Sequence, residues 1–340
     1  MKKTILRIGA ILLLGICIYL AATILKFKSP HGIDQKDGLY WQPENTIDLV
    51  LMGSSHVHCG GNTVVLWEHY GIPAYDYSAA EQPLWMTYYY LQEFLKYQNP
   101  KVVFLDLYSP ARFKDDYQYE WIGENIHGMK FSLTKVKMLL DSVEPEKLGD
   151  YFPSFAVYHG RYADVTETDY SHFFWNQKER AVFKGFTPYW KRDDQTRPDA
   201  EQMQAIQPGG LTLKSEEYLG KIIELTKEEG CELILGVIPH IEIPEDRATY
   251  LEIREIAEEQ GVTFINFNDH CDQMGIDYAV DFHDDSHLNY WGSAKFSNYL
   301  GYFLVNDMGL TSKKGQEGYE SWDEHVTAIT HELMEQNSHK

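Results

Sequence analysis

Three residues that lie far apart in the sequence have the side chains needed for nucleophilic catalysis. Ser55 follows the apolar run 47–52 and a glycine, whereas Asp284 and His287 lie close together near the C-terminus. A nucleophilic serine needs a base that accepts its proton, and the base needs a carboxylate that holds its ring in one tautomer. We therefore interpret Ser55 as a candidate nucleophile, His287 as its base and Asp284 as the residue that orients the base.

Two other interpretations of these residues stay open. A serine that follows a strand and a glycine is common in turns, where it can cap the next helix. Histidines and carboxylates can also bind zinc or manganese. A metal site would draw on residues beside Ser55 and around the C-terminal pair, namely His56, His58, His283, His287, Asp281, Asp284 and Asp285. We favour the serine mechanism, which predicts neither a metal nor a cofactor.

Two short motifs resemble sequence blocks of a known superfamily. Gly53-Ser54-Ser55 and Asp284-x-x-His287, in that order, resemble the first and last blocks of the SGNH/GDSL hydrolases. The following Leu288-Asn289-x-x-Gly292 resembles a membrane-linked branch that includes alginate and peptidoglycan O-acetyltransferases and teichoic-acid D-alanyl transfer proteins. The resemblance spans residues 45–307 and selects Asp284 over the neighbouring aspartates. It implies a three-layer, flavodoxin-like α/β fold with a parallel sheet.

The resemblance also implies a function. A serine esterase or acyltransferase would act on an acylated substrate or glycan of the cell envelope, beside a membrane acyl-donor protein. Its oxyanion hole would use the backbone N–H of Ser55 and a donor from segment 77–82, which follows a further expected strand. The candidate oxyanion or substrate residues are Ser54, Ala79, Ala80 and Gln82. Ser54 takes the place of the usual aspartate and is the weaker nucleophile candidate. No Gly-x-Asn-Asp follows Leu107, so the third donor has no assignment. The alternative is a non-catalytic glycan-binding or scaffold protein that retains the fold.

An apolar segment near the N-terminus predicts a membrane anchor. Residues 8–25 carry no charge, and a helix of 18 residues is about 27 Å long, just enough to cross a bilayer. Lys2, Lys3 and Arg7 precede it, which predicts a cytoplasmic N-terminus and an extracytoplasmic main domain. A cleaved signal peptide is the alternative, but no clear cleavage site follows the segment. We expect an uncleaved, single-pass anchor.

The rest of the chain is strongly acidic. The full sequence has a formal net charge of −21, and without the five basic residues of 1–28 the charge is −26. Such a surface repels nucleic acid, so we expect no nucleic-acid partner. Outside the membrane segment lie Cys59, Cys231 and Cys271, whose spacing permits one disulfide without specifying it.

Apolar runs alternate with helical patterns along the main domain. Strands are expected over 47–52, 101–107, 232–238 and 262–266. Helices are expected over 60–70, 83–95, 215–229, 246–260 and 291–306. The strand runs are continuously apolar, which is typical of parallel strands buried on both faces. Such sheets bind ligands at the C-terminal ends of their strands, and Ser55 lies at one of these ends.

These patterns divide the chain into parts. Residues 1–28 form the cytoplasmic tip and transmembrane anchor, 29–45 a polar stalk, and 46–307 the main domain. Within the domain, 108–213 is aromatic-rich and lacks a clear period, so we expect an insertion over the active end of the sheet. The polar tail 308–340 contains Ser321-x-x-Glu324, a capping box that predicts a helix packed on the domain.

Overall fold

A five-stranded sheet forms the centre of the computed structural model, which describes residues 2–26, 29–151, 160–167, 169–170 and 181–338. The strand order is β2-β1-β3-β4-β5, and every neighbouring pair is parallel. The strands are β1 (Leu49–Met52), β2 (Ala74–Asp76), β3 (Val102–Asp106), β4 (Glu232–Val237) and β5 (Thr263–Asn266). The predicted α/β class with a parallel sheet is confirmed.

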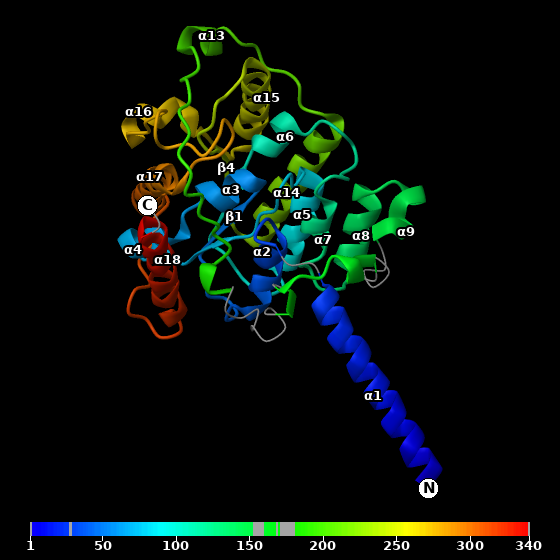
Figure 1. The fold of residues 1–340 in the computed structure, drawn as a ribbon. Coiled ribbons are helices and arrows are strands. Elements are labelled where there is room, and N and C mark those ends of the chain that lie inside the picture. Colours follow the sequence, from blue (N-terminus) through cyan, green and yellow to red (C-terminus); the bar gives the residue numbers. More distant parts are fainter. Residues whose placement is uncertain (1, 27–28, 152–159, 168, 171–180, 339–340) are drawn as a thin grey trace.

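Helices cover both faces of the sheet and give the domain three layers (Figure 1). Side chains of one face, such as Val50 and Val103, pack with α5 (Leu84–Phe94), α14 (Leu213–Glu229) and α15 (Pro244–Gln260). The opposite face packs with α4 (Thr63–Tyr70) and α17 (Tyr290–Asn306). Successive strand residues point to opposite faces, so burial of both faces requires the continuous apolar runs seen in the sequence.

Shorter helices occupy the connections between these elements. They are α3 (Ser55–Gly60), α6 (Tyr108–Arg112), α7 (Ile122–Ile126), α8 (Leu133–Ser142), α9 (Leu148–Tyr151), α13 (Ala200–Gln204) and α16 (Cys271–Met274). Five 3₁₀ turns lie among the described residues: η1 (Leu39–Trp41), η2 (Pro145–Lys147), η3 (Gly160–Ala163), η4 (Ala181–Phe183) and η5 (Phe267–His270). The expected insertion is therefore partly helical, and its residues 152–159, 168 and 171–180 lie outside the described part of the chain.

The segment expected to form a stalk is packed into the domain. Residues of α2 (Ile33–Gly38) are largely buried, and Lys36 is fully buried. Its Nζ donates to the carbonyl of Tyr77 and to Oε1 of Gln82, and it lies over the rings of Tyr77 and Tyr90. A buried lysine is tolerated only with such partners, which cannot be inferred from a polar local sequence.

Several helix ends differ from the sequence expectations. The helix predicted over 60–70 begins at Thr63, because the side chain of Asn62 caps it by accepting from the N–H of Val65. Thr212 rather than Ser215 caps α14. The tail helix α18 (Glu320–Ser338) begins before Ser321, whose hydroxyl accepts from Nζ of Lys184. Trp322 and Ile329 of α18 are fully buried, so this helix packs on the domain.

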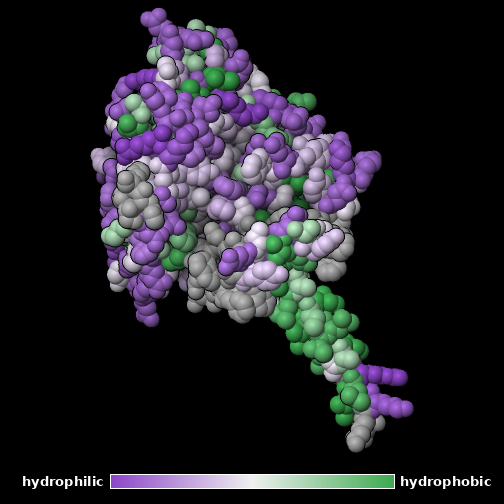
Figure 2. Space-filling view, in the orientation of Figure 1, coloured by the Kyte–Doolittle hydropathy of each residue, from purple (hydrophilic) through white to green (hydrophobic). Residues whose placement is uncertain are grey.

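The N-terminal helix α1 (Lys2–Leu25) projects away from the domain (Figure 1). Its segment Lys3–Leu25 is long and apolar enough to cross a membrane, and none of its most hydrophobic stretch is buried in the protein. Figure 2 shows a hydrophobic surface along this helix, next to a mostly hydrophilic domain surface. The predicted anchor segment is therefore a separate helix and does not belong to the domain core.

Candidate active site

Ser55 is the first residue of α3, directly after β1. Between them, Gly53 has a φ of 146°, and a Cβ there would lie 2.9 Å from both Cβ of Asp106 and Cγ2 of Val57. Only glycine fits this turn without strain. Because Ser55 begins a helix, its backbone N–H has no acceptor within that helix.

His287 and Asp284 lie in the loop that precedes α17. Nε2 of His287 is 2.8 Å from Oγ of Ser55, and Nδ1 is 2.8 Å from Oδ1 of Asp284. The same carboxylate oxygen accepts from the backbone N–H groups of Ser286 and His287, both at 2.9 Å. Burial opposes ionisation of Asp284, but these hydrogen bonds outweigh it and lower its pKa to about 2. The structure thus brings together the three residues that the sequence indicated.

Further hydrogen bonds hold this loop in place. The N–H of His283 donates to the carbonyl of His287 at 2.8 Å, and the Asn289 side chain donates to the carbonyls of Val280 and Phe282. On the other side, the hydroxyl of Tyr108 lies 2.9 Å from Oγ of Ser286. Tyr108 follows β3, so the loop is tied to the strand next to β1.

Buried histidines surround the triad. The ring of His56 stacks on Tyr108 with 3.5 Å between centroids, and it lies 5.5 Å from the ring of His287 and 5.1 Å from that of His240. Burial lowers the pKa of His56 well below its usual range, and the neighbouring His240 and His287 lower it further. A ring that remains neutral does not add a second positive charge beside His287.

Other residues at the site come from segments without a catalytic motif. His58 shares a hydrogen bond of 3.2 Å with the hydroxyl of Tyr189, whose ring lies 5.7 Å from that of His287. His31 precedes α2, and its ring lies 5.5 Å from that of His58. Burial lowers the pKa of His31, and the charge of His287 adds to this effect. His58 lies in α3 with Ser55, but no periodicity or spacing in the sequence links Tyr189 or His31 to Ser55.

The open alternative of a metal site has little support in the geometry. Among the residues that the structure describes, no group of three or more His, Cys, Asp or Glu is arranged to hold a metal ion. Asp281 instead forms an ion pair with Lys295, and Asp284 binds His287. Cys59, Cys231 and Cys271 are buried free thiols.

A cavity of about 330 Å³ opens beside Ser55. Its walls come from the turn after β1, from Glu81 and from the residues after β3: Ser54, Ser55, Glu81, Tyr108, Ser109, Arg112 and Phe113. The hydroxyls of Ser54 and Ser109 are buried and have no hydrogen-bond partner within the described part of the chain. An unpaired buried hydroxyl costs free energy, so these two groups are candidate donors to a bound substrate.

The other residues expected in the oxyanion hole are engaged elsewhere. The backbone N–H of Ala79 donates to the carbonyl of Gly53 at 3.3 Å, and that of Ala80 donates to the carbonyl of His31 at 2.7 Å. The side chain of Gln82 is fully buried, accepts from Lys36 and donates to Thr87 at 2.8 Å. Gln82 therefore belongs to the core around Lys36 and does not line the cavity beside Ser55.

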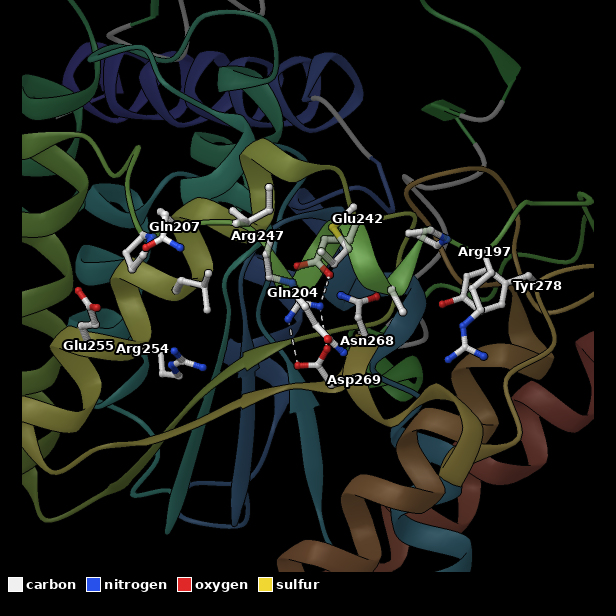
Figure 3. A pocket seen from close by; sticks show the side chains of 16 residues that line it. Arg197, Gln204, Gln207, Glu242, Arg247, Arg254, Glu255, Asn268, Asp269 and Tyr278 are labelled. Atoms are coloured by element: carbon white, nitrogen blue, oxygen red, sulfur yellow. Dashed lines mark hydrogen bonds and ion pairs between the residues drawn. The ribbon is translucent and has the colours of Figure 1, made fainter.

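A larger cavity of about 710 Å³ lies between α15 and the segment that carries α13 (Figure 3). Arg247 bridges Glu242 at 2.9 Å and Asp269 at 2.7 Å, so its charge is already neutralised. None of the triad residues lines this cavity. Of these two cavities, the one beside Ser55 therefore adjoins the Ser-His-Asp arrangement.

The fold and this geometry define a three-layer α/β domain with a Ser-His-Asp arrangement at the C-terminal edge of its sheet. No protein-family model matches the chain, and no curated protein matches it. The function is therefore inferred from the residues of the site themselves.

Proposed function

We propose that this protein is a serine esterase or acyltransferase of the SGNH type, in which Ser55, His287 and Asp284 form the catalytic triad. The observation that carries the proposal is the pair of 2.8 Å contacts that links Ser55 to His287 and His287 to Asp284. Nucleophile, base and orienting carboxylate must lie within hydrogen-bond reach in this order. The position after β1 adds support, because parallel sheets bind ligands at this edge.

The chemistry is acyl transfer in two steps. Oγ of Ser55 attacks the carbonyl carbon of the donor while Nε2 of His287 takes its proton. The bond to the leaving oxygen then breaks, and that oxygen receives the proton from His287, which leaves an ester on Ser55. A sugar hydroxyl or water attacks this ester and gives its proton to His287, which returns it to Ser55. Asp284 stabilises the imidazolium that forms in each step.

The negative oxygen of each tetrahedral intermediate needs hydrogen-bond donors. The backbone N–H of Ser55 is one, and the hydroxyls of Ser54 and Ser109 are assigned as the others. Both residues line the cavity at Ser55, and their buried hydroxyls have no other partner among the described residues. Ser109 takes the role that the sequence left unassigned after β3. One such donor is worth about 2.7–4 kcal/mol in the transition state.

The substrate is proposed to be an acylated component or glycan of the cell envelope. Support comes from α1, which is long and apolar enough to span a membrane, and from the basic residues before it. On this basis we propose that the N-terminus lies in the cytoplasm and the domain outside, where a membrane acyl-donor protein is a suitable partner. A cavity of about 330 Å³ suits a short acyl group better than a long chain.

The alternative is a non-catalytic glycan-binding or scaffold protein with the same fold. The observation that favours it is the use of the backbone N–H of Ala80 by the carbonyl of His31. That contact removes one of the donors expected for the oxyanion.

Labelling of the full-length protein in detergent decides between these functions. A fluorophosphonate should modify Ser55, and p-nitrophenyl acetate should be hydrolysed. Ser55→Ala should abolish both, whereas Ser312→Ala, which removes an exposed hydroxyl, should abolish neither. A folded protein with no labelling and no turnover on acyl esters would favour the scaffold function.

A further inference from the structure

Large apolar side chains are exposed around the end of α1. Leu133 is 80% exposed and Tyr162 is 75% exposed, although large apolar side chains are more often buried. Five such residues come from four separate segments, and we call them the collar: Trp41, Phe131, Leu133, Tyr162 and Tyr170. Their position relative to α1 follows from contacts made by the last residues of that helix.

Arg161 connects the first part of the collar to α1. Its Nη1 donates to the carbonyls of Leu25 and Lys26 at 3.0 and 3.1 Å. Its Nη2 binds both carboxylate oxygens of Asp169 at 3.0 and 3.2 Å. Tyr162 and Tyr170 are the chain neighbours of these two residues, so both lie close to the end of α1.

Asp37 links the second part of the collar, Trp41, to Lys26, the residue that follows α1. One carboxylate oxygen accepts from Nζ of Lys26 at 3.2 Å, and the other accepts from Nε1 of Trp41 at 3.4 Å. Trp41 is therefore one side chain away from the residue that follows α1, and its ring is 46% exposed.

The third part of the collar, Phe131 and Leu133, belongs to segment 127–135. The backbone N–H of Lys130 donates to the hydroxyl of Tyr40 at 3.0 Å, directly beside Trp41. Burial lowers the pKa of Lys135 to about 8, and the charge of Lys26 adds to this effect. Figure 1 shows α7 and α8 at the same end of α1.

The length of α1 sets where the collar lies relative to a membrane. Segment Lys3–Leu25 has 23 residues and is about 34 Å long, slightly more than the ~30 Å hydrocarbon core of a bilayer. Leu25 and Lys26 would then lie at the membrane–water interface. Trp and Tyr are enriched at that level, because their rings are apolar and their N–H or O–H groups can stay hydrated.

We propose that the collar inserts into the interfacial layer of the bilayer that holds α1, so that the domain rests on the membrane in one orientation. This inference depends on the membrane anchoring proposed above. The surface suits lipid although the protein is acidic, because Lys26 and Arg161 lie at its centre and the nearby Asp37 and Asp169 are paired with them. Such docking would hold the cavity at Ser55 at a constant height above the membrane, where a membrane-bound donor could meet it.

Site-specific fluorescence in nanodiscs of phosphatidylcholine tests this orientation. In full-length protein with Cys17→Ala, an environment-sensitive dye is attached at Leu133→Cys or Tyr162→Cys, and the three remaining cysteines are buried. Leu213→Cys is the matched control, because Leu213 is 85% exposed but belongs to α14. We expect blue-shifted emission and quenching by spin-labelled lipid at 133 and 162, and neither effect at 213.

The native Cys17 lies within α1, so the same dye attached there tests the membrane anchor separately from the docked orientation of the domain. Quenching at Cys17 without quenching at 133 and 162 would keep the anchor and overturn the docked orientation. Absence of quenching at Cys17 would overturn both the anchor and the collar inference. Protection of 133 and 162 from aqueous iodide, without quenching by lipid, would show that another protein chain covers the collar and would contradict the lipid partner.

Discussion

Nε2 of His287 lies 2.8 Å from Oγ of Ser55, although 232 residues of chain separate the two. The contact forms because β1 and β3 are parallel neighbours, so the turn after β1 and the turn after β3 lie at one edge of the sheet. Tyr108, after β3, then binds Ser286 and brings the loop of His287 to the same edge. Five consequences of this arrangement are open to experiment.

Removal of the base or of its orienting carboxylate should eliminate catalysis. His287→Ala and Asp284→Asn should each lower kcat for p-nitrophenyl acetate by about 10⁴-fold, because without them Ser55 has no correctly oriented base. Asp285→Asn is the control, since the Asp285 side chain accepts from the hydroxyl of Ser286 and, among the described residues, makes no hydrogen bond to His287. Equal losses in all three variants, with unchanged circular dichroism, would contradict the assignment of Asp284.

The hydroxyls of Ser54 and Ser109, two residues that line the cavity at Ser55, should stabilise the transition state. Ser109→Ala and Ser54→Ala should each reduce kcat by about 10²–10³-fold with little change in KM, because each removes a donor to the oxyanion. Ser142→Ala is the matched control, since its hydroxyl is also buried and unpartnered but lies at the end of α8. Steady-state kinetics on the three variants provides the comparison. A rise in KM alone would show that the serines bind substrate without stabilising the intermediate.

Gly53 should tolerate no side chain. Gly53→Ala places a methyl group 2.9 Å from side-chain atoms of Asp106 and Val57, in a backbone conformation that favours glycine. We expect a loss of about 1–3 kcal/mol in unfolding free energy and a displaced Ser55, measured by denaturant unfolding and by turnover. Gly220→Ala in α14 should be neutral or stabilising by up to about 1 kcal/mol, because nothing lies within 4 Å of the added methyl group. Full activity of Gly53→Ala would contradict the described turn.

Stability should depend on pH through Asp76 at the end of β2. Burial raises its pKa to about 7 from a usual 3.8, although hydrogen bonds from Ser78 oppose the shift. The folded protein therefore binds this proton more tightly than the unfolded chain, and stability falls as the pH rises from about 4 to about 7. In that window Asp76 contributes a slope of up to about 1.4 kcal/mol per pH unit.

The variant Asp76→Asn isolates that contribution. It should be increasingly stable relative to the natural protein as the pH rises from 4 to 8, because an amide does not ionise. Chemical unfolding at several pH values measures the difference. A stability difference that is constant with pH would show that Asp76 is not protonated in the folded state.

Chelation should leave catalysis unchanged. Among the residues that the structure describes, no group of three or more His, Cys, Asp or Glu is arranged to hold a metal ion, and Asp281 is paired with Lys295. Turnover of p-nitrophenyl acetate should therefore be the same before and after dialysis against EDTA. Loss of activity, restored by zinc or manganese and retained in Ser55→Ala, would support the metal alternative.

Features that depend on local pattern could be predicted from the sequence. Continuous apolar runs indicated buried parallel strands, and the uncharged run 8–25 indicated a helix long enough for a membrane. The spacing of Asp284 and His287 placed two members of the candidate site in one loop. These inferences were possible because strand burial, helix length and motif spacing are properties of neighbouring residues.

Contacts between distant residues became visible in the folded protein and could not be predicted from the sequence. Tyr189 approaches His287, His31 approaches His58, and Ser109 joins Ser54 beside Ser55. The burial of Lys36, in a segment that looked like a polar stalk, depends on a carbonyl, an amide and two rings from elsewhere in the fold. These contacts have no local signature, because their energy comes from partners that the folded backbone brings together.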